Sequence, residues 1–356
     1  MGRPAILGLH RMALIFNGRC LTRPISGVER HARMLLRSFL RSGIDMRVLV
    51  PADAPEDAVL LSGLNVERVG RLRGHAWEQF TLARAVGRDD LLFSPANTGP
   101  LGVRRQAIVV HDLAFLHHPE WFDPRFTKWY GFLVPRLVRR AKVVITVSES
   151  IRKELMATYA LPPERVVVIP PHVDPAQFSA TEPVQAPPGF FLLVGHDDPR
   201  KDARAALDLL FRARPGAHAV VVGRERRPFI AVDRSPDGRI TWLPNVTDAQ
   251  LTWLYDHAQA LLYPSLYEGF GMPVLEAAQR GCPVVARPLP VLLEQFGPAV
   301  HACPFTGSDD LSGVLDRISA RGTGPDSRSP ETQQVLDHFT ERRTDAALNA
   351  VIAGLT

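Results

Sequence analysis

The sequence predicts an α/β protein built from two doubly wound domains. Short apolar runs rich in valine and isoleucine alternate with helical patterns, as in buried parallel strands that are joined by helices. These runs lie at residues 108–110, 143–147, 165–169, 190–194, 219–222, 260–263 and 283–286. A chain of 356 residues is also longer than one ordinary domain and suits two.

Proline density marks the boundary between the two predicted domains. Six prolines fall within residues 170–188, a density that supports no regular structure, and a new apolar run begins at Phe190. We therefore expect one domain over residues 1–172 and a second over residues 189–335. The chain should end in one amphipathic helix, at roughly residues 330–352.

Composition argues against several classes of protein. Hydrophobic residues make up 46% of the chain and charged residues 22%, and no apolar run reaches the length of about 18 that a membrane-spanning helix needs. The apolar run at residues 5–16 is interrupted by His10 and Arg11, and no clear cleavage site follows, so we do not expect a signal peptide. The three cysteines are far apart, which fits a reducing cytoplasm.

The net charge of +5 leaves two interpretations open. One is a solvated basic surface, and the other is attraction to an anionic lipid or acceptor. The basic run formed by Arg136, Arg139, Arg140 and Lys142 fits either the solvated face of a helix or a patch that faces a membrane. No nucleic-acid-binding motif is present, so nucleic acid is not an expected partner.

The densest pattern lies at residues 263–276, Tyr-Pro-Ser-Leu-Tyr-Glu-Gly-Phe-Gly-Met-Pro-Val-Leu-Glu. A strand should end at Ser265, a glycine loop should run from Glu268 to Gly271, and Pro273 suits the first turn of a helix. A strand, a glycine loop and a helix start direct free backbone N–H groups at a phosphate. The loop residues expected to bind such a ligand are Gly269, Phe270, Gly271 and Met272.

Two carboxylates, Glu268 and Glu276, bracket this loop. A glycosidase would hold its two acids about 5 to 9.5 Å apart, whereas a continuous helix would separate these two by about 12 Å along its axis. The loop leaves the true distance open. We favour separate roles, with Glu276 on ribose hydroxyls and Glu268 near a sugar. The alternative is a pair of surface glutamates favoured by the helix dipole.

This stretch resembles the E-x7-E motif of a family of retaining glycosyltransferases that includes bacterial mannosyltransferases and polysaccharide glycosyltransferases. The flanking residues 251–258 and 277–285 are also similar, and the resemblance covers nearly the whole chain. It implies the GT-B fold, in which two Rossmann-like domains hold the active site in the cleft between them. It further implies that no metal or other cofactor is needed and that residues 336–356 cross back to the first domain.

A second segment, residues 195–201, is similar to the donor-phosphate segment of that family. Gly195 follows a strand, and Arg200 and Lys201 end the turn. An arginine can bind two phosphate oxygens and a lysine acts as a point charge, so these two cations should stabilise a leaving diphosphate. His196 stands where some members of the family have arginine.

A third segment, residues 108–122, is similar to the His-Asp-Leu segment of the family. His111 ends a strand at its carboxyl edge, where α/β proteins bind ligands, and the resemblance places it beside the donor sugar. The alternative for a lone histidine is packing. His117 and His118 are expected to be structural.

Two further loops resemble donor-binding parts of the family. Residues 25–30 are similar to its N-terminal glycine loop, so Gly27 should face the donor phosphate and the acceptor. Residues 243–248 are similar to the loop whose backbone touches the nucleobase, which assigns that contact to Val246.

The resemblance implies transfer of a hexose from a nucleotide diphosphate sugar to a glycan or lipid-linked acceptor, with retention of configuration. A GDP-mannose-type donor is the first expectation, because residues 111–122 resemble mannosyl- and rhamnosyltransferases of cell-surface polysaccharide assembly. The expected location is the cytoplasm, at the inner face of the plasma membrane if the basic run binds lipid.

Three alternatives remain. One is an enzyme of the same fold with a UDP-glucose-type donor. Another is a non-catalytic relative, which would be expected to lose the glutamates or the cations that this chain keeps. The third is a nicotinamide-dependent oxidoreductase, which would need a G-x-G-x-x-G motif after an early strand, and none is visible there.

Overall fold

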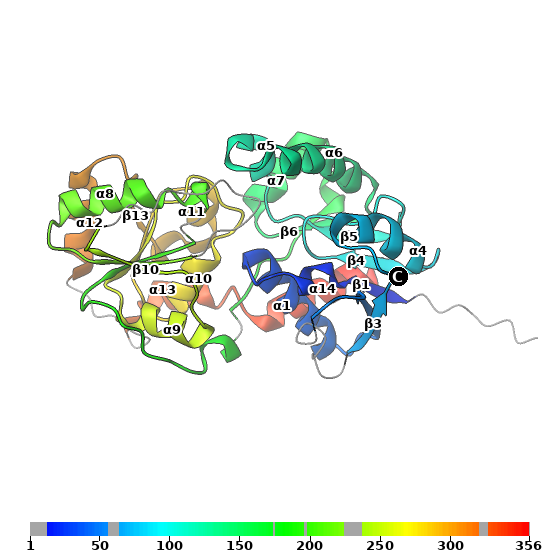
Figure 1. The fold of residues 1–356 in the computed structure, drawn as a ribbon, viewed down its shortest axis with the longest axis horizontal. Coiled ribbons are helices and arrows are strands. Elements are labelled where there is room, and N and C mark those ends of the chain that lie inside the picture. The colour runs from blue at the N-terminus through cyan, green and yellow to red at the C-terminus, as the bar shows by residue number, and fades with distance from the viewer. Residues whose placement is uncertain are drawn as a thin grey trace, which may run out of the picture.

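The computed structural model shows two lobes, each built on a parallel sheet with helices on both faces (Figure 1). It describes residues 13–55, 64–173, 175–195, 198–223, 237–319 and 327–355. His196 and most of the N-terminal apolar run lie outside these ranges. The predicted fold, with two Rossmann-like sheets, is confirmed.

The first lobe contains a seven-stranded sheet in the order β3-β2-β1-β4-β5-β6-β7, with all neighbouring strands parallel. Its strands are β1 (Leu14–Asn17), β2 (Met46–Pro51), β3 (Asn65–Val69), β4 (Leu91–Ser94), β5 (Gln106–Val109), β6 (Val143–Thr146) and β7 (Val166–Val168). Side chains alternate between the two faces, so Ile108 and Val109 enter different buried clusters. The strand order reverses between β1 and β4, and ligands bind at such a switch point in open α/β sheets.

Helices cover both faces of this sheet (Figure 1). They are α1 (Gly27–Arg41), α3 (Gly74–Ala76), the π-helical turn η2 (Trp77–Leu82), α4 (Ala83–Ala85), α5 (Ala114–His117), α6 (Pro124–Arg140) and α7 (Glu149–Tyr159). Short 3-10 turns join them at η1 (Gly18–Thr22), η3 (Pro119–Trp121) and η4 (Pro163–Arg165). Leu35 and Phe39 of α1 pack on one face, and Leu133 and Leu137 of α6 pack on the other.

The second lobe repeats the same topology with six parallel strands in the order β10-β9-β8-β11-β12-β13. Its strands are β8 (Phe191–Val194), β9 (Ala219–Val222), β10 (Ile240–Leu243), β11 (Ala260–Tyr263), β12 (Val284–Ala286) and β13 (His301–Ala302). The helices and 3-10 turns are η6 (Pro199–Lys201), α8 (Ala203–Ala213), α9 (Asp248–His257), α10 (Met272–Gln279), α11 (Pro290–Phe296), η7 (Gly297–Ala299) and α12 (Ser308–Ser319). The switch point of this sheet lies between β8 and β11.

The chain crosses between the lobes twice. The first crossing leaves β7 and enters β8 through the proline-rich segment, whose described residues contain the 3-10 turn η5 (Pro175–Phe178) and neither a strand nor an α-helix. The second crossing returns near the C-terminus. His172 and Thr344 join the two crossings through a hydrogen bond of 3.0 Å between Nδ1 and Oγ1.

The single helix expected over residues 330–352 is wrong, because the structure has two helices there. They are α13 (Pro330–Leu336) and α14 (Glu341–Ala353). Phe339, in the break, packs against Phe270 and Phe296 in the second lobe. Leu348 and Ile352 of α14 pack in the core of the first lobe. One straight helix could not reach both cores, so the chain bends between them (Figure 1).

In the part of the chain that the structure describes, no helix combines the length and the apolar character that crossing a bilayer requires.

Candidate active site

Residues from both switch points line one cleft between the lobes, with a volume of about 1100 Å³. Loops after β1, β4 and β5 form the first-lobe wall, and loops after β8 and β11 form the opposite wall. The structure brings all the predicted site residues together in the lining of this cleft: Gly27, His111, Gly195, Arg200, Lys201, Val246, Glu268, Gly269, Phe270, Gly271, Met272 and Glu276.

Arg200 lies in the turn η6 and contacts carboxylates from both lobes. Its Nε donates to Asp198 Oδ2 at 2.7 Å, and its Nη1 donates across the cleft to Asp112 Oδ2 at 3.0 Å. Burial alone would lower the pKa of Arg200, but Asp198 and Asp112 hold that pKa well above its ordinary value. The guanidinium is therefore a permanent cation that links the two lobes.

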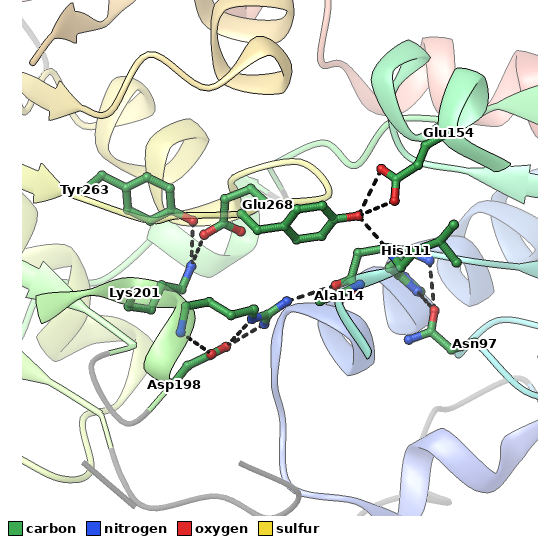
Figure 2. A network of polar contacts seen from close by, with 12 residues as sticks. Asn97, His111, Ala114, Glu154, Asp198, Lys201, Tyr263 and Glu268 are labelled. Carbon is green, nitrogen blue, oxygen red and sulfur yellow. Dashed lines mark hydrogen bonds and ion pairs between the residues drawn. The ribbon is translucent and has the colours of Figure 1, made fainter. Parts of the chain in front are cut away.

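Lys201 is paired with the first glutamate of the motif. Its ammonium group lies 2.5 Å from Glu268 Oε1 and donates to Tyr263 Oη at 2.7 Å, as Figure 2 shows. Burial alone would raise the pKa of Glu268, but the charges of Lys201 and Arg200 outweigh it and keep that pKa below its ordinary value. An anionic ligand in the cleft must therefore compete with Glu268 for Lys201.

The glycine loop presses against the first lobe. A Cβ at Gly269 would lie 2.1 Å from the carbonyl oxygen of His111, so only a glycine fits there. The hydroxyl of Ser148, at the start of α7, donates to the carbonyl of Gly269 at 2.9 Å. Gly271 has φ 109° and precedes α10, with Pro273 in the first turn. Pro273 has no N–H, and those of Val274 and Leu275 bond to the carbonyl of Gly271, so the first turn of α10 can offer the cleft the backbone N–H of Met272.

Glu276 is buried one turn into α10. It accepts a hydrogen bond from Tyr255 Oη at 3.0 Å and from Gln177 Nε2 at 3.2 Å. Arg30 of α1 reaches across the cleft, with Nε 3.8 Å from Glu276 Oε1 and two further bonds to Asp248. Burial raises the pKa of Glu276, and the charge of Arg30 offsets part of that rise.

His111 follows β5 and uses both ring nitrogens within the protein. Nδ1 lies 2.9 Å from Asn97 Oδ1, and Nε2 lies 3.1 Å from His31 Nδ1. Burial lowers the pKa of His111 to about 4, so the ring is neutral at pH 7. His117 and His118 contact Glu154 and Trp121 and do not line the cleft.

Sequence reasoning missed several cleft residues, among them Arg30, His31 and Asn97. Arg30 and His31 could have been found, because Gly27, Arg30 and His31 have the spacing i, i+3 and i+4, which puts them on one face of α1. Asn97 has φ 63°, and its contact with His111 spans fourteen positions, so no local pattern marks it. Among the described residues, no group of histidine, cysteine, aspartate and glutamate side chains has a metal-binding arrangement.

Solved structures share this architecture over nearly the whole chain. Sucrose-phosphate synthase from Thermosynechococcus elongatus matches with a TM-score of 0.70 and 14% identity, over 97% of this chain and 99% of that chain. WaaG, a glycosyltransferase involved in lipopolysaccharide biosynthesis, matches with a TM-score of 0.64 and 16% identity, over 97% of this chain and 100% of that chain. The fold is therefore that of the GT-B glycosyltransferases.

Two family models together match residues 25–322 of the chain. Glycosyltransferase Family 4 matches residues 25–177, and Glycosyl transferases group 1 matches residues 177–322. The chain belongs to glycosyltransferase family 4, a family of retaining hexosyltransferases.

Curated relatives include bacterial mannosyltransferases. The O-antigen chain mannosyltransferase RfbU of Salmonella typhimurium is 29% identical over 241 residues, which cover 65% of this chain and 67% of the relative. The O-antigen chain mannosyltransferase B of Escherichia coli is 27% identical over 237 residues, 60% of each chain. The MMP alpha-(1->4)-mannosyltransferase of Mycolicibacterium hassiacum is 27% identical over 216 residues, 56% of this chain and 51% of the relative. The last two matches span less than two thirds of those relatives.

Proposed function

We propose that this enzyme transfers mannose from a GDP-mannose-type donor to a glycan or lipid-linked acceptor during assembly of a cell-surface polysaccharide. The observation that carries this proposal is the similarity to three proteins that are named mannosyltransferases, two of them for O-antigen chains. Residues 1–172 form the acceptor-side domain and residues 189–335 the donor-side domain in this proposal.

Different cleft residues contact different parts of the donor in this proposal. Glu276 accepts hydrogen bonds from the ribose hydroxyls, the backbone of Val246 contacts the nucleobase, and the loop at Gly27 faces the phosphates. The start of α10 and the cations Arg200 and Lys201 bind the diphosphate, because N–H groups and positive charges attract its oxygens. Glu268 and His111 lie beside the hexose.

Charge stabilisation is the main catalytic contribution in this proposal. The bond between the anomeric carbon and the diphosphate oxygen breaks, and negative charge builds on the leaving nucleoside diphosphate. Arg200 and Lys201 are already in place and largely withdrawn from water, where preorganised charges act most strongly. The acceptor hydroxyl attacks from the same face, and its proton passes to the leaving phosphate, so configuration is retained.

A ligand panel tests the donor. A compound that binds only the folded protein raises its melting temperature, and the rise grows with the ratio of ligand concentration to Kd. GDP-mannose and GDP should raise the Tm more than the UDP, ADP and dTDP compounds do, and added acceptor should release GDP. A larger shift with UDP-glucose would move the assignment to a glucose-type donor. No shift with any nucleotide sugar would overturn the proposed activity.

We further propose that the enzyme works at the inner face of an anionic membrane. Four exposed cations, Arg136, Arg139, Arg140 and Lys142, lie on or just after α6. Phe132 on the same helix is 45% exposed, with the guanidinium of Arg136 3.9 Å from its ring centroid. Basic residues beside an exposed aromatic ring suit a lipid surface that carries negative charge.

A further inference from the structure

Three side chains form a continuous hydrogen-bonded row at the first-lobe wall of the cleft. Asn97 follows β4, His111 follows β5, and His31 lies in the second turn of α1. Asn97 Oδ1 lies 2.9 Å from His111 Nδ1, and His111 Nε2 lies 3.1 Å from His31 Nδ1. Figure 2 shows the contact between the first two.

The direction of every bond in this row can be worked out from its first member. The backbone N–H of His111 donates to Asn97 Oδ1 at 2.8 Å, so the atom at that position must be the amide oxygen. An oxygen accepts, which means that His111 carries its proton on Nδ1. Nε2 of a neutral His111 is then an acceptor, and His31 must donate to it from Nδ1.

His31 is the last member of the row. Its side chain is 1% exposed, and Nε2 has no hydrogen-bond partner within the described residues. Burial lowers the pKa of His31 well below 6.5, with the nearby His111 and His172 adding to that effect. Both rings are therefore neutral at pH 7, and the row has one stable arrangement of its protons.

The middle member of the row, His111, touches the loop that carries Glu268. The carbonyl of His111 is the atom that a Cβ at Gly269 would strike, so the His111 peptide and the glycine loop are in direct contact. If the His111 ring changed its position and shifted the His111 backbone, the backbone would push on Gly269, which is next to Glu268. With both of its nitrogens bonded inside the protein, the His111 ring is held by its partners and is not free to turn toward a sugar.

We propose that His31 is a positioning residue. Through its Nδ1–H it fixes the ring of His111, and through His111 it sets where the glycine loop and Glu268 stand relative to the first lobe. The proposal rests on the proposed function for its kinetic test. It predicts that His31 acts on turnover and not on nucleotide binding, because the row contacts neither Glu276 nor Lys201.

Two amides at position 31 separate this role from simple packing. The amide nitrogen of His31→Asn lies where Nδ1 lies in histidine, whereas that of His31→Gln reaches the position of Nε2. His31→Asn should keep most of the wild-type kcat. His31→Gln and His31→Leu should each lower kcat by roughly tenfold or more, as misplaced catalytic geometry does, and leave the Kd for free nucleotide within about twofold. Equal kcat values for Asn, Gln and Leu would overturn the proposal.

A double variant gives a second kinetic criterion. Residues that act as one unit are not additive, so His31→Leu combined with His111→Ala should be no slower than His111→Ala alone. Multiplied losses in the double variant would mean that His31 acts independently of His111, and would also overturn the proposal.

Nitrogen NMR tests the row without any turnover. In protein labelled with ¹⁵N-histidine, peaks of the two rings are assigned by their loss in His31→Leu and His111→Ala. Both rings should be neutral at pH 7 with the proton on Nδ1, and His31→Leu should shift the Nε2 resonance of His111. A proton on Nε2 of either ring would overturn the inference. Wild-type protein with this NMR pattern but no glycosyl transfer would instead refute the proposed function alone.

Discussion

Single residues in the cleft differ in how their charge is balanced. Glu268 is paired with a cation at 2.5 Å, whereas Glu276 accepts hydrogen bonds from two neutral side chains and has Arg30 at 3.8 Å. Removing one partner of a buried ion pair leaves the other charge uncompensated, which costs far more than losing an exposed pair. The two glutamates should therefore respond differently to substitution.

Glu276→Ala should weaken binding of free nucleotide and of nucleotide sugar alike, because both carry ribose. Loss of hydrogen bonds to a charged group costs about 1.5–3 kcal/mol, or roughly 10- to 100-fold in Kd. Glu268→Gln, which keeps the shape of the side chain, should leave free-nucleotide affinity nearly unchanged and lower kcat. Calorimetric titration with GDP and steady-state kinetics measure the two effects. Equal loss of GDP affinity in both variants would contradict the assignment.

Lys201→Ala should lower kcat by about 10²–10³-fold, the usual cost of losing one preorganised charge stabiliser. Because the substitution also leaves Glu268 buried without its cation, Lys201→Ala combined with Glu268→Gln should recover stability but not turnover. The wild type should stay active in excess EDTA if, as proposed, the cations and the helix start bind the diphosphate without a metal ion. Reversible loss of activity in EDTA would show that a metal ion binds the diphosphate instead.

Gly269→Ala should separate the glycine loop from the first lobe. The new Cβ would lie 2.1 Å from a backbone oxygen, so one of the two loops must move. We expect a cost of about 1–3 kcal/mol in stability and a large fall in kcat. Gly131→Ala in α6 is the matched control, because nothing lies within 4 Å of its Cβ, and it should stabilise by about 0.5–1 kcal/mol. Melting curves and kinetics that do not distinguish these two variants would count against the contact.

At the scale of elements, the sequence predicted the buried strands best. Runs of apolar residues marked β5, β6, β7, β8, β9, β11 and β12, because strands covered on both faces need no polar alternation. The edge strands β3 and β10 were not marked, since their side chains are partly exposed and their pattern is mixed. The buried strands β1, β2 and β4 also lie outside the marked runs. The break in the last helix could not be predicted from a local pattern, because the two cores that Phe339 and Leu348 enter lie in different lobes.

Site residues that lie within short sequence motifs were predicted, whereas contacts between distant parts of the chain were not. The glycine loop, both glutamates and the pair Arg200 and Lys201 lie within short motifs, and all of them line the cleft. The pairing of Lys201 with Glu268 joins residues 67 positions apart, and that of Arg200 with Asp112 joins residues 88 apart. Such contacts depend on how the sheets and lobes are assembled, which no single motif encodes.

The proposed membrane contact belongs to helix α6. Each basic residue near an anionic surface contributes about 1 kcal/mol, so Arg139→Ser with Arg140→Ser should weaken binding to phosphatidylserine vesicles by roughly 30-fold. Arg342→Ser with Arg343→Ser, an exposed adjacent pair on α14, removes the same charge and should have a much smaller effect. Binding should also fall as salt rises. Sedimentation with vesicles measures both, and equal losses in the two variants would refute the assignment to α6.

At the scale of the whole molecule, buried neutral histidines should make stability depend on pH. Burial lowers the pKa of His111 and of His172 to about 4, and that of His31 well below 6.5. Between pH 6.5 and about 4 the unfolded chain binds protons at these positions and the folded protein does not. Stability therefore falls as pH is lowered through this window, by an amount on the order of 3 kcal/mol for a histidine shifted to about 4.

Urea unfolding midpoints at steps from pH 7.5 to 4.5 measure this dependence. Charged neighbours modify it, because Asp112 and Glu29 raise the pKa of His111, and Arg41 lowers that of His172. His172→Gln should flatten the slope, since it removes one of the groups that the folded protein keeps neutral. A midpoint that stays constant from pH 6.5 to 4.5 would be inconsistent with buried neutral histidines.

The double crossing between the lobes also limits how the enzyme can move. A single connecting segment would allow the lobes to rotate and shift relative to each other in any direction. Two chain segments that are hydrogen-bonded to each other at His172 and Thr344 define a hinge axis. The lobes can rotate easily about this axis, and other relative motions are restricted. The walls of the cleft can then separate to admit a donor and return to the same alignment each time. We therefore expect residues that pair across the cleft, such as Arg200 and Asp112, to meet again in the same geometry after each opening.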